Sequence, residues 1–152
     1  MKITIHTDGG ARGNPGPAGI GVVIVKQDNP DKRDKQEISK YIGIATNNQA
    51  EYRAVIEALA WAKENLANHT SNYTPGMSEK VEIECLLDSE LIVEQLNQRY
   101  KLKNEGLKPL FWEIRELVMA LGGKVTFKYI PREKNKEADR LANKAIDNQK
   151  QI

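Results

Sequence analysis

The first 45 residues contain three stretches of strand character with no room for a helix between them. Lys2–Asp8 alternates polar and apolar side chains, and residues 18–27 and 37–45 are rich in residues that favour strands. A Gly- and Pro-rich turn separates the first two stretches, and a short charged loop over residues 27–35 separates the last two. Because parallel strands need a longer crossover, such short connections predict an antiparallel meander.

The remainder of the chain alternates helical and strand patterns. Apolar residues at helical spacing run from Asn48 to about Asn65, and Asn47 or Asn48 could cap this helix. A polar loop over 67–80 is expected next, then a strand over 81–87, helices over 89–97 and 109–121, a strand over 124–130 and a helix over 135–148. The long helix makes the fourth strand parallel to the first. The expected fold class is therefore α/β, a mixed five-stranded sheet of three antiparallel strands followed by two parallel ones, flanked by helices.

Length and composition are those of an ordinary soluble protein. The chain has 152 residues, of which 39% are hydrophobic and 29% charged, so a single domain over residues 1–152 is expected. Its longest apolar run, Ala18–Val25, is too short to cross a bilayer, and we expect no membrane partner. The only cysteine, Cys85, can close no intramolecular disulfide, which favours a cytoplasmic location. We also expect a monomer.

Charge is distributed unevenly along the chain. Residues 1–98 contain 10 Lys and Arg against 14 Asp and Glu, whereas residues 99–152 contain 13 against 7. A protein that binds a polyanion and also has an acidic metal site could have this distribution. From charge alone, an unevenly charged solvated surface is the simpler explanation.

Four acidic residues occupy positions that the expected fold would bring together. Asp8 and Asp88 each end a strand, at the edge of the sheet where α/β proteins keep their sites. Glu51 is expected in the first turn of the long helix, and Asp139 lies one turn into the last helix. Either aspartate alone is more simply a turn residue, but the combination is far more specific. We call these four residues the acidic quartet. Oxygen ligands without His or Cys favour Mg²⁺ or Mn²⁺, and two such ions can promote phosphodiester hydrolysis.

The motifs that contain the quartet resemble those of the type 1 ribonuclease H family, over nearly the whole chain. The matching pieces are Thr7-Asp8-Gly9-Gly10, Ala18-Gly19-Ile20-Gly21, Thr46-Asn47-Asn48 with Glu51, Leu87-Asp88-Ser89 and Glu137-Ala138-Asp139-Arg140-Leu141-Ala142. The resemblance implies a ribonuclease H-like fold and an endonuclease that hydrolyses the RNA strand of RNA/DNA hybrids, leaving 5′-phosphate and 3′-hydroxyl ends. It also implies that the quartet is catalytic and binds two Mg²⁺ ions, with Mn²⁺ as a possible substitute.

The resemblance extends to substrate contacts. It implies that Asn14, Asn47 and Asn48 read 2′-hydroxyls, which agrees with the ability of amides both to donate and to accept. Thr46 and Asn104 match the family's phosphate pocket for the DNA strand, although Thr46 and Asn47 could equally have a capping or core role. The remaining residues assigned to substrate binding are Gly9, Ser89, Lys101 and Lys103.

The chain departs from the family pattern in two places. Many members have a histidine in the loop before the last catalytic aspartate, whereas here the loop reads Pro131-Arg132-Glu133-Lys134-Asn135. The basic protrusion of some members is also missing, and Lys101 and Lys103 could supply part of its contact with the nucleic-acid backbone.

Two alternative functions remain open at this stage. A catalytically silent module that binds hybrids or duplexes is disfavoured because all four acids are present. A metal-dependent phosphatase is disfavoured because Gly10 stands where such enzymes have a second aspartate after Asp8.

Overall fold

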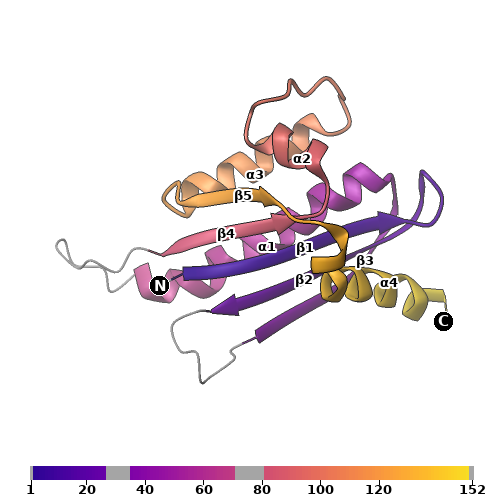
Figure 1. The fold of residues 1–152 in the computed structure, drawn as a ribbon, viewed down its shortest axis with the longest axis horizontal. Coiled ribbons are helices and arrows are strands. Elements are labelled where there is room, and N and C mark those ends of the chain that lie inside the picture. The colour runs from indigo at the N-terminus through magenta and orange to yellow at the C-terminus, as the bar shows by residue number, and fades with distance from the viewer. Residues whose placement is uncertain (1, 27–34, 71–80, 151–152) are drawn as a thin grey trace.

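The computed structural model describes residues 2–26, 35–70 and 81–150. Its elements are β1 (Lys2–Ala11), β2 (Gly16–Lys26), β3 (Lys35–Ala45), α1 (Asn47–Thr70), β4 (Glu82–Leu87), α2 (Glu90–Leu96), α3 (Lys108–Ala120), β5 (Val125–Tyr129), the 3-10 turn η1 (Arg132–Lys134) and α4 (Lys136–Lys150) (Figure 1). The charged loop predicted between the second and third strands and most of the polar loop predicted over 67–80 lie outside the described residues.

The five strands form one mixed sheet in the order β3-β2-β1-β4-β5. β1 pairs with β2, and β2 with β3, in the antiparallel sense, whereas β4 pairs in parallel with both β1 and β5. This confirms the predicted fold class. β1 is the strand where the two halves of the sheet meet, so its carboxyl end is a point at which the sheet changes direction.

Helices cover the two faces of the sheet unequally. The larger hydrophobic core joins β1, β2 and β4 to α1, α2 and α3, and its fully buried members include Ile5, Ile24, Leu59, Leu87 and Ile114. Helix α4 lies on the other face, where Ala138 and Leu141 pack against Val23 of β2 (Figure 1). The acids carried by α1 and α4 therefore approach the end of β1 from opposite sides.

Helix α4 lies close to β2 because glycine residues of β2 leave room for the helix backbone. A Cβ atom on Gly21 would lie 2.0 Å from the carbonyl oxygen of Ala138, and one on Gly19 would lie 2.5 Å from that of Ala142. No side chain fits at either position. The Ala18-Gly19-Ile20-Gly21 motif therefore has a packing role, which is to let α4 bring Asp139 down to the sheet.

Two boundaries differ by more than two residues from those expected from the sequence. β1 does not end at Asp8, because its pairing with β2 continues to the pair Ala11 and Ala18. Helix α1 continues to Thr70 and so includes the first residues of the predicted polar loop. Within the described residues, no helix combines the length and the apolar character that crossing a bilayer would require.

Candidate metal centre

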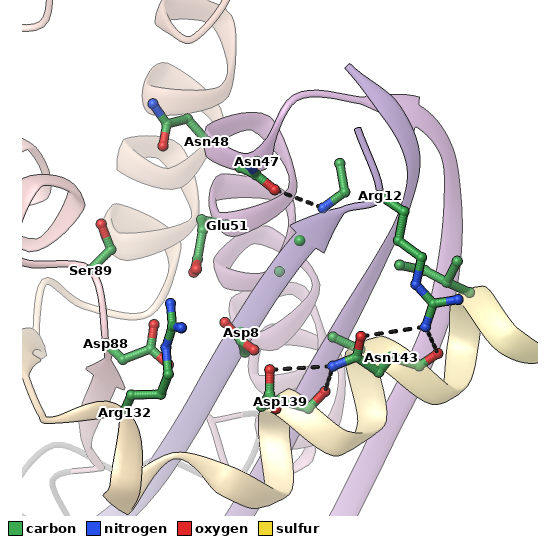
Figure 2. A pocket seen from close by; sticks show the side chains of 15 residues that line it. Asp8, Arg12, Asn47, Asn48, Glu51, Asp88, Ser89, Arg132, Asp139 and Asn143 are labelled. Atoms are coloured by element: carbon green, nitrogen blue, oxygen red, sulfur yellow. Dashed lines mark hydrogen bonds between the residues drawn. The ribbon is translucent and has the colours of Figure 1, made fainter. Parts of the chain in front are cut away.

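The acidic quartet lines one cavity of about 420 Å³ at the carboxyl end of β1. Asp8, Glu51 and Asp88 each offer a carboxylate oxygen, and these oxygens lie within 4.8 Å of one another. Asp139 lies on the α4 side of the same cavity, within hydrogen-bonding reach of Asp8 (Figure 2). The structure thus brings together all four acids that the sequence singled out.

The two aspartates from the sheet lie at the same edge because their strands are parallel. Thr7 and Leu87 form the last pair between β1 and β4, so the next residues are Asp8, still in β1, and Asp88, just after β4. Asp8 still pairs with Gly21 of β2 on its other side, and it is therefore held within the sheet. Pairing with β2 thus fixes the backbone position of Asp8.

Glu51 enters the cavity from α1, which begins with a capping box. The Thr46 hydroxyl oxygen accepts a hydrogen bond from the Gln49 N–H at 3.1 Å, and the Gln49 side-chain oxygen accepts one from the Thr46 N–H at 2.9 Å. The predicted cap at Asn47 or Asn48 was therefore wrong. The prediction that Glu51 lies in the first turn of α1 was wrong as well. The first turn contains no acid, and Glu51 is the first residue after that turn.

Gly9 allows α1 to approach β1. A Cβ atom on Gly9 would lie 2.2 Å from the carbonyl oxygen of Ala50, so only glycine fits beneath this turn of the helix. The Gly9 N–H also donates a hydrogen bond to Glu51. Gly9 therefore has a structural role, which is to let the Glu51 carboxyl lie next to Asp8. Its predicted contact with substrate is a separate matter.

Burial and mutual repulsion raise the proton affinity of this site. Asp8 and Glu51 are each only 8% exposed. Burial, followed by the charge of Asp88, raises the pKa of Asp8 to about 7. Burial, with the charges of Asp8 and Asp88, raises the pKa of Glu51 well above its usual value. The hydrogen bond between the two side chains raises the pKa of Glu51 further and lowers that of Asp8.

A metal ion would resolve this repulsion. The second Glu51 oxygen, Oε2, is buried and has no hydrogen-bond partner among the described residues. A buried oxygen of this kind is costly unless a ligand satisfies it, and a divalent cation would also neutralise the neighbouring carboxylates. The carboxylate-only donor set suits a hard cation. The residues present therefore fit a metal ion.

Asn135 is a component of the site that the sequence reasoning missed. Its side chain is almost fully buried, and its Nδ2 donates to the Thr7 carbonyl at 2.9 Å and to Asp88 Oδ2 at 3.0 Å. The one feature of the sequence that could have pointed to Asn135 was its position, directly before the last helix and between the candidates Asp88 and Asp139. Nothing in the local sequence shows that its partners lie on β1 and after β4.

Arg12 and Asn143 form a second missed contact, on the Asp139 side of the cavity. Asn143 Nδ2 donates to the Asp139 carbonyl at 3.0 Å and to Asp139 Oδ1 at 3.3 Å. The Arg12 guanidinium donates to Asn143 (Figure 2). It also forms an ion pair with Asp147. The turn between β1 and β2 is thereby tied to the helix that carries the fourth acid. Arg132, from the loop that lacks the expected histidine, also lines the cavity.

The residues assigned to substrate binding fall into two groups. Four of them line the cavity with the quartet: Gly9, Asn47, Asn48 and Ser89. The other five lie outside its lining: Asn14, Thr46, Lys101, Lys103 and Asn104.

Several of these residues also have structural partners. Asn14 Oδ1 accepts from the Asn47 N–H at 3.0 Å, and Asn47 Oδ1 accepts from the Ala11 N–H at 2.8 Å, so both fasten the β1–β2 turn to α1. Ser89 Oγ accepts from the Ile92 N–H and caps α2. Lys101 and Lys103 are exposed on the connection between α2 and α3. Contact with substrate remains a prediction for all nine residues.

Comparison with known proteins places the chain in a family. Residues 6–145 match the family model described as "Reverse transcriptase-like". The Ribonuclease H of Erythrobacter litoralis is 32% identical over an alignment that covers 96% of each chain. The Bifunctional protein Rv2228c of Mycobacterium tuberculosis is 38% identical over 97% of this chain, which spans only 36% of that protein's length.

Solved structures agree with this placement. LC11-RNase H1, isolated from compost by a metagenomic approach, is 46% identical, with 97% of each chain covered and a TM-score of 0.82. RNase H1 of Halobacterium salinarum is 34% identical, with 97% of this chain and 99% of that chain covered and a TM-score of 0.76. On the evidence of sequence, fold and site together, the chain belongs to the ribonuclease H family.

Proposed function

We propose that this protein is an endonuclease that hydrolyses the RNA strand of RNA/DNA hybrids and leaves 5′-phosphate and 3′-hydroxyl ends. The observation that supports it best is the convergence of four acids from four parts of the chain on one cavity, with a buried Glu51 oxygen that has no hydrogen-bond partner in the part of the chain that the structure describes. LC11-RNase H1, which is 46% identical to this chain, has also been solved in complex with an RNA/DNA hybrid, with a TM-score of 0.80.

In this proposal, the acidic quartet holds two Mg²⁺ ions, and Mn²⁺ can replace them. When bound, such ions supply an activated water and stabilise the leaving oxygen of a phosphodiester. The protein contributes a fixed frame: Asp8 is held by the sheet, and Glu51 is held by Gly9 and by the capped end of α1. The dry surroundings of these two carboxyls strengthen their interaction with a cation.

Recognition of the hybrid would come from the rim of the cavity. Asn47, Asn48 and Ser89 line it on the α1 and α2 side, and their amide and hydroxyl groups suit a 2′-hydroxyl, which both donates and accepts. Asn14 extends this surface along the β1–β2 turn. Thr46 and Asn104 would hold a phosphate of the DNA strand, and exposed Lys101 and Lys103 would contact the backbone further away.

We further propose that residues 1–152 act as a single domain, monomeric and located in the cytoplasm. The sheet and its helices share one main hydrophobic core, which supports the single domain. Cys85 is buried and free, which suits a reducing compartment.

A cleavage assay on end-labelled substrates tests this function. The panel contains an RNA/DNA hybrid, an RNA duplex, a DNA duplex and a DNA duplex with one ribonucleotide, each with Mg²⁺, Mn²⁺ or EDTA. We expect cleavage of the hybrid with metal, none with EDTA, and recovery when Mg²⁺ is added in excess. Asp88→Asn should abolish cleavage, whereas Glu105→Gln, which changes an exposed acid between α2 and α3, should not.

Each alternative has its own outcome in this panel. Binding of the hybrid without cleavage in any metal would indicate a silent binding module. Release of phosphate from small phosphate esters, with the hybrid left intact, would indicate a phosphatase. Near-normal cleavage by Asp88→Asn would show that the assignment of the acidic quartet as the catalytic site is wrong.

A further inference from the structure

Asn135 connects the three segments that carry the aspartates of the quartet. Its side chain donates to Thr7, the last residue of β1 that pairs with β4, and to Asp88 beyond the end of β4. Its own carbonyl accepts the Asp139 N–H at 3.1 Å in the first turn of α4. The partners are up to 128 residues away in sequence, and the side chain is 1% exposed. A single buried residue thus contacts all three segments, at the end of the β1–β4 pairing and at the start of α4.

The Asn135 side chain does not cap its own helix. An asparagine before a helix usually accepts a first-turn N–H through its side-chain oxygen. Here that oxygen, Oδ1, is buried without a hydrogen-bond partner among the described residues, and the amide nitrogen makes both side-chain contacts. Two donors on one nitrogen are available from an amide but not from a hydroxyl or a carboxylate. An asparagine therefore suits this position, because its amide nitrogen can donate to the Thr7 carbonyl and to the Asp88 carboxylate at the same time.

We propose that Asn135 is a positioning residue for metal binding, which acts by holding one oxygen of Asp88 and so presents the other to the cation. The inference rests on the proposed function. Asp88 follows the last residue of β4, and its charge repels the neighbouring carboxyl groups of Asp8 and Glu51. The bond from Asn135 opposes that repulsion before any cation arrives. It also ties Asp88 to the backbone next to Asp8, so the two ligands keep their spacing.

The test compares Asn135→Ala with a matched control, Asn97→Ala. Asn97 also donates its side-chain amide to a strand carbonyl, that of Phe127 at 3.0 Å, but it joins the end of α2 to β5 and does not line the cavity. Calorimetric titration of the metal-free proteins with Mn²⁺ gives the affinity without any cleavage. Loss of a group that orients a metal ligand typically weakens binding by about 10–100-fold, and we expect a weakening of at least about tenfold for Asn135→Ala.

Kinetics separate positioning from general stability. For Asn135→Ala, the Mg²⁺ concentration for half-maximal cleavage should rise by a similar factor, and added Mg²⁺ should restore part of kcat, while the KM for the hybrid stays near the wild-type value. Asn97→Ala should lower the Tm and leave metal affinity unchanged. If Asn135→Ala does not fold, Asn135→Ser, which keeps one donor, replaces it with a smaller expected loss.

Two results would overturn the inference. One is a folded Asn135 variant whose Mn²⁺ affinity is within twofold of the wild type. The other is an equal loss of affinity in Asn97→Ala. If the wild type cleaves no hybrid, the proposed function fails, but the calorimetric comparison still decides the role of Asn135.

Discussion

Asp8 should destabilise the metal-free fold, and Asp8→Asn should therefore stabilise it. Burial and Asp88 raise the pKa of Asp8 from 3.8 to about 7. One pKa unit corresponds to about 1.4 kcal/mol, so ionised Asp8 costs the folded state up to roughly 4 kcal/mol. Because Asp8 titrates together with Glu51, part of that cost is shared between them. We expect Asp8→Asn to raise the free energy of unfolding by about 2–4 kcal/mol at pH 8.

The dependence of this gain on pH has a definite sign. The folded state holds the Asp8 proton more tightly than the unfolded state does, because the folded pKa is the higher one. Stability is therefore greatest below the unfolded value of 3.8 and is lost as pH rises through about 7. The difference between wild type and Asp8→Asn should be large at pH 8 and should shrink toward zero near pH 4.

Urea denaturation followed by circular dichroism, in EDTA and at several pH values, measures this difference. Glu105→Gln is the control, because its side chain is 83% exposed and its effect should stay within about 0.5 kcal/mol. Adding Mg²⁺ should stabilise the wild type more than Asp8→Asn, since only the wild type keeps the full ligand set. An Asp8→Asn variant no more stable than the wild type at pH 8 in EDTA would refute the electrostatic reasoning.

Three further predictions concern the rim, the packing of α4 and the fourth acid. Replacing Lys101 and Lys103 together with Ala should reduce the slope of log affinity for the hybrid against log salt by about 1–2, and an unchanged slope would show that they do not touch phosphate. Gly21→Ala should lower the free energy of unfolding by about 2–3 kcal/mol in thermal unfolding, since its Cβ would meet the Ala138 carbonyl, whereas Gly10→Ala, with no atom within 4 Å of its Cβ, should cost less. Asn143→Ala should raise the Mg²⁺ requirement for cleavage by about tenfold, because it releases Asp139. Asn65→Ala removes a similar amide contact, to the Trp61 carbonyl on α1, and should leave that requirement unchanged.

The sheet and the positions of the four acids were predictable because the signals are strong and mostly local. Short connections fix the antiparallel meander, and a long helix before the fourth strand fixes its direction. Those two facts bring Asp8 and Asp88 to one edge. Glu51 and Asp139 follow because each lies close to the beginning of a helix that starts near that edge.

The errors arose where two local signals competed. Thr46 and Asn47 are both good helix caps, and only the partner Gln49, three residues after Thr46, decides between them. Gly9 and Gly10 suggest a turn, but their pairing with β2 keeps them in a strand. In the second case, a contact with a neighbouring strand overrides local preference.

The contacts that were missed are those that join distant parts of the chain. Asn135 meets Thr7 and Asp88, and Arg12 meets Asn143, across 47 to 131 residues of sequence. A single sequence contains no pattern that pairs them. Such ties become visible only when the strands and helices are in place.

The close packing of α4 on β2 determines when the metal site can be completed. All five strands of the described sheet and three of the four acids precede α4 in sequence, so the acidic quartet cannot be complete before α4 is synthesised. Asp139 arrives only when the helix emerges and settles over Gly19 and Gly21. A proteolytic cut between β5 and α4 would free this helix to leave the sheet and would take the fourth carboxylate out of the cavity.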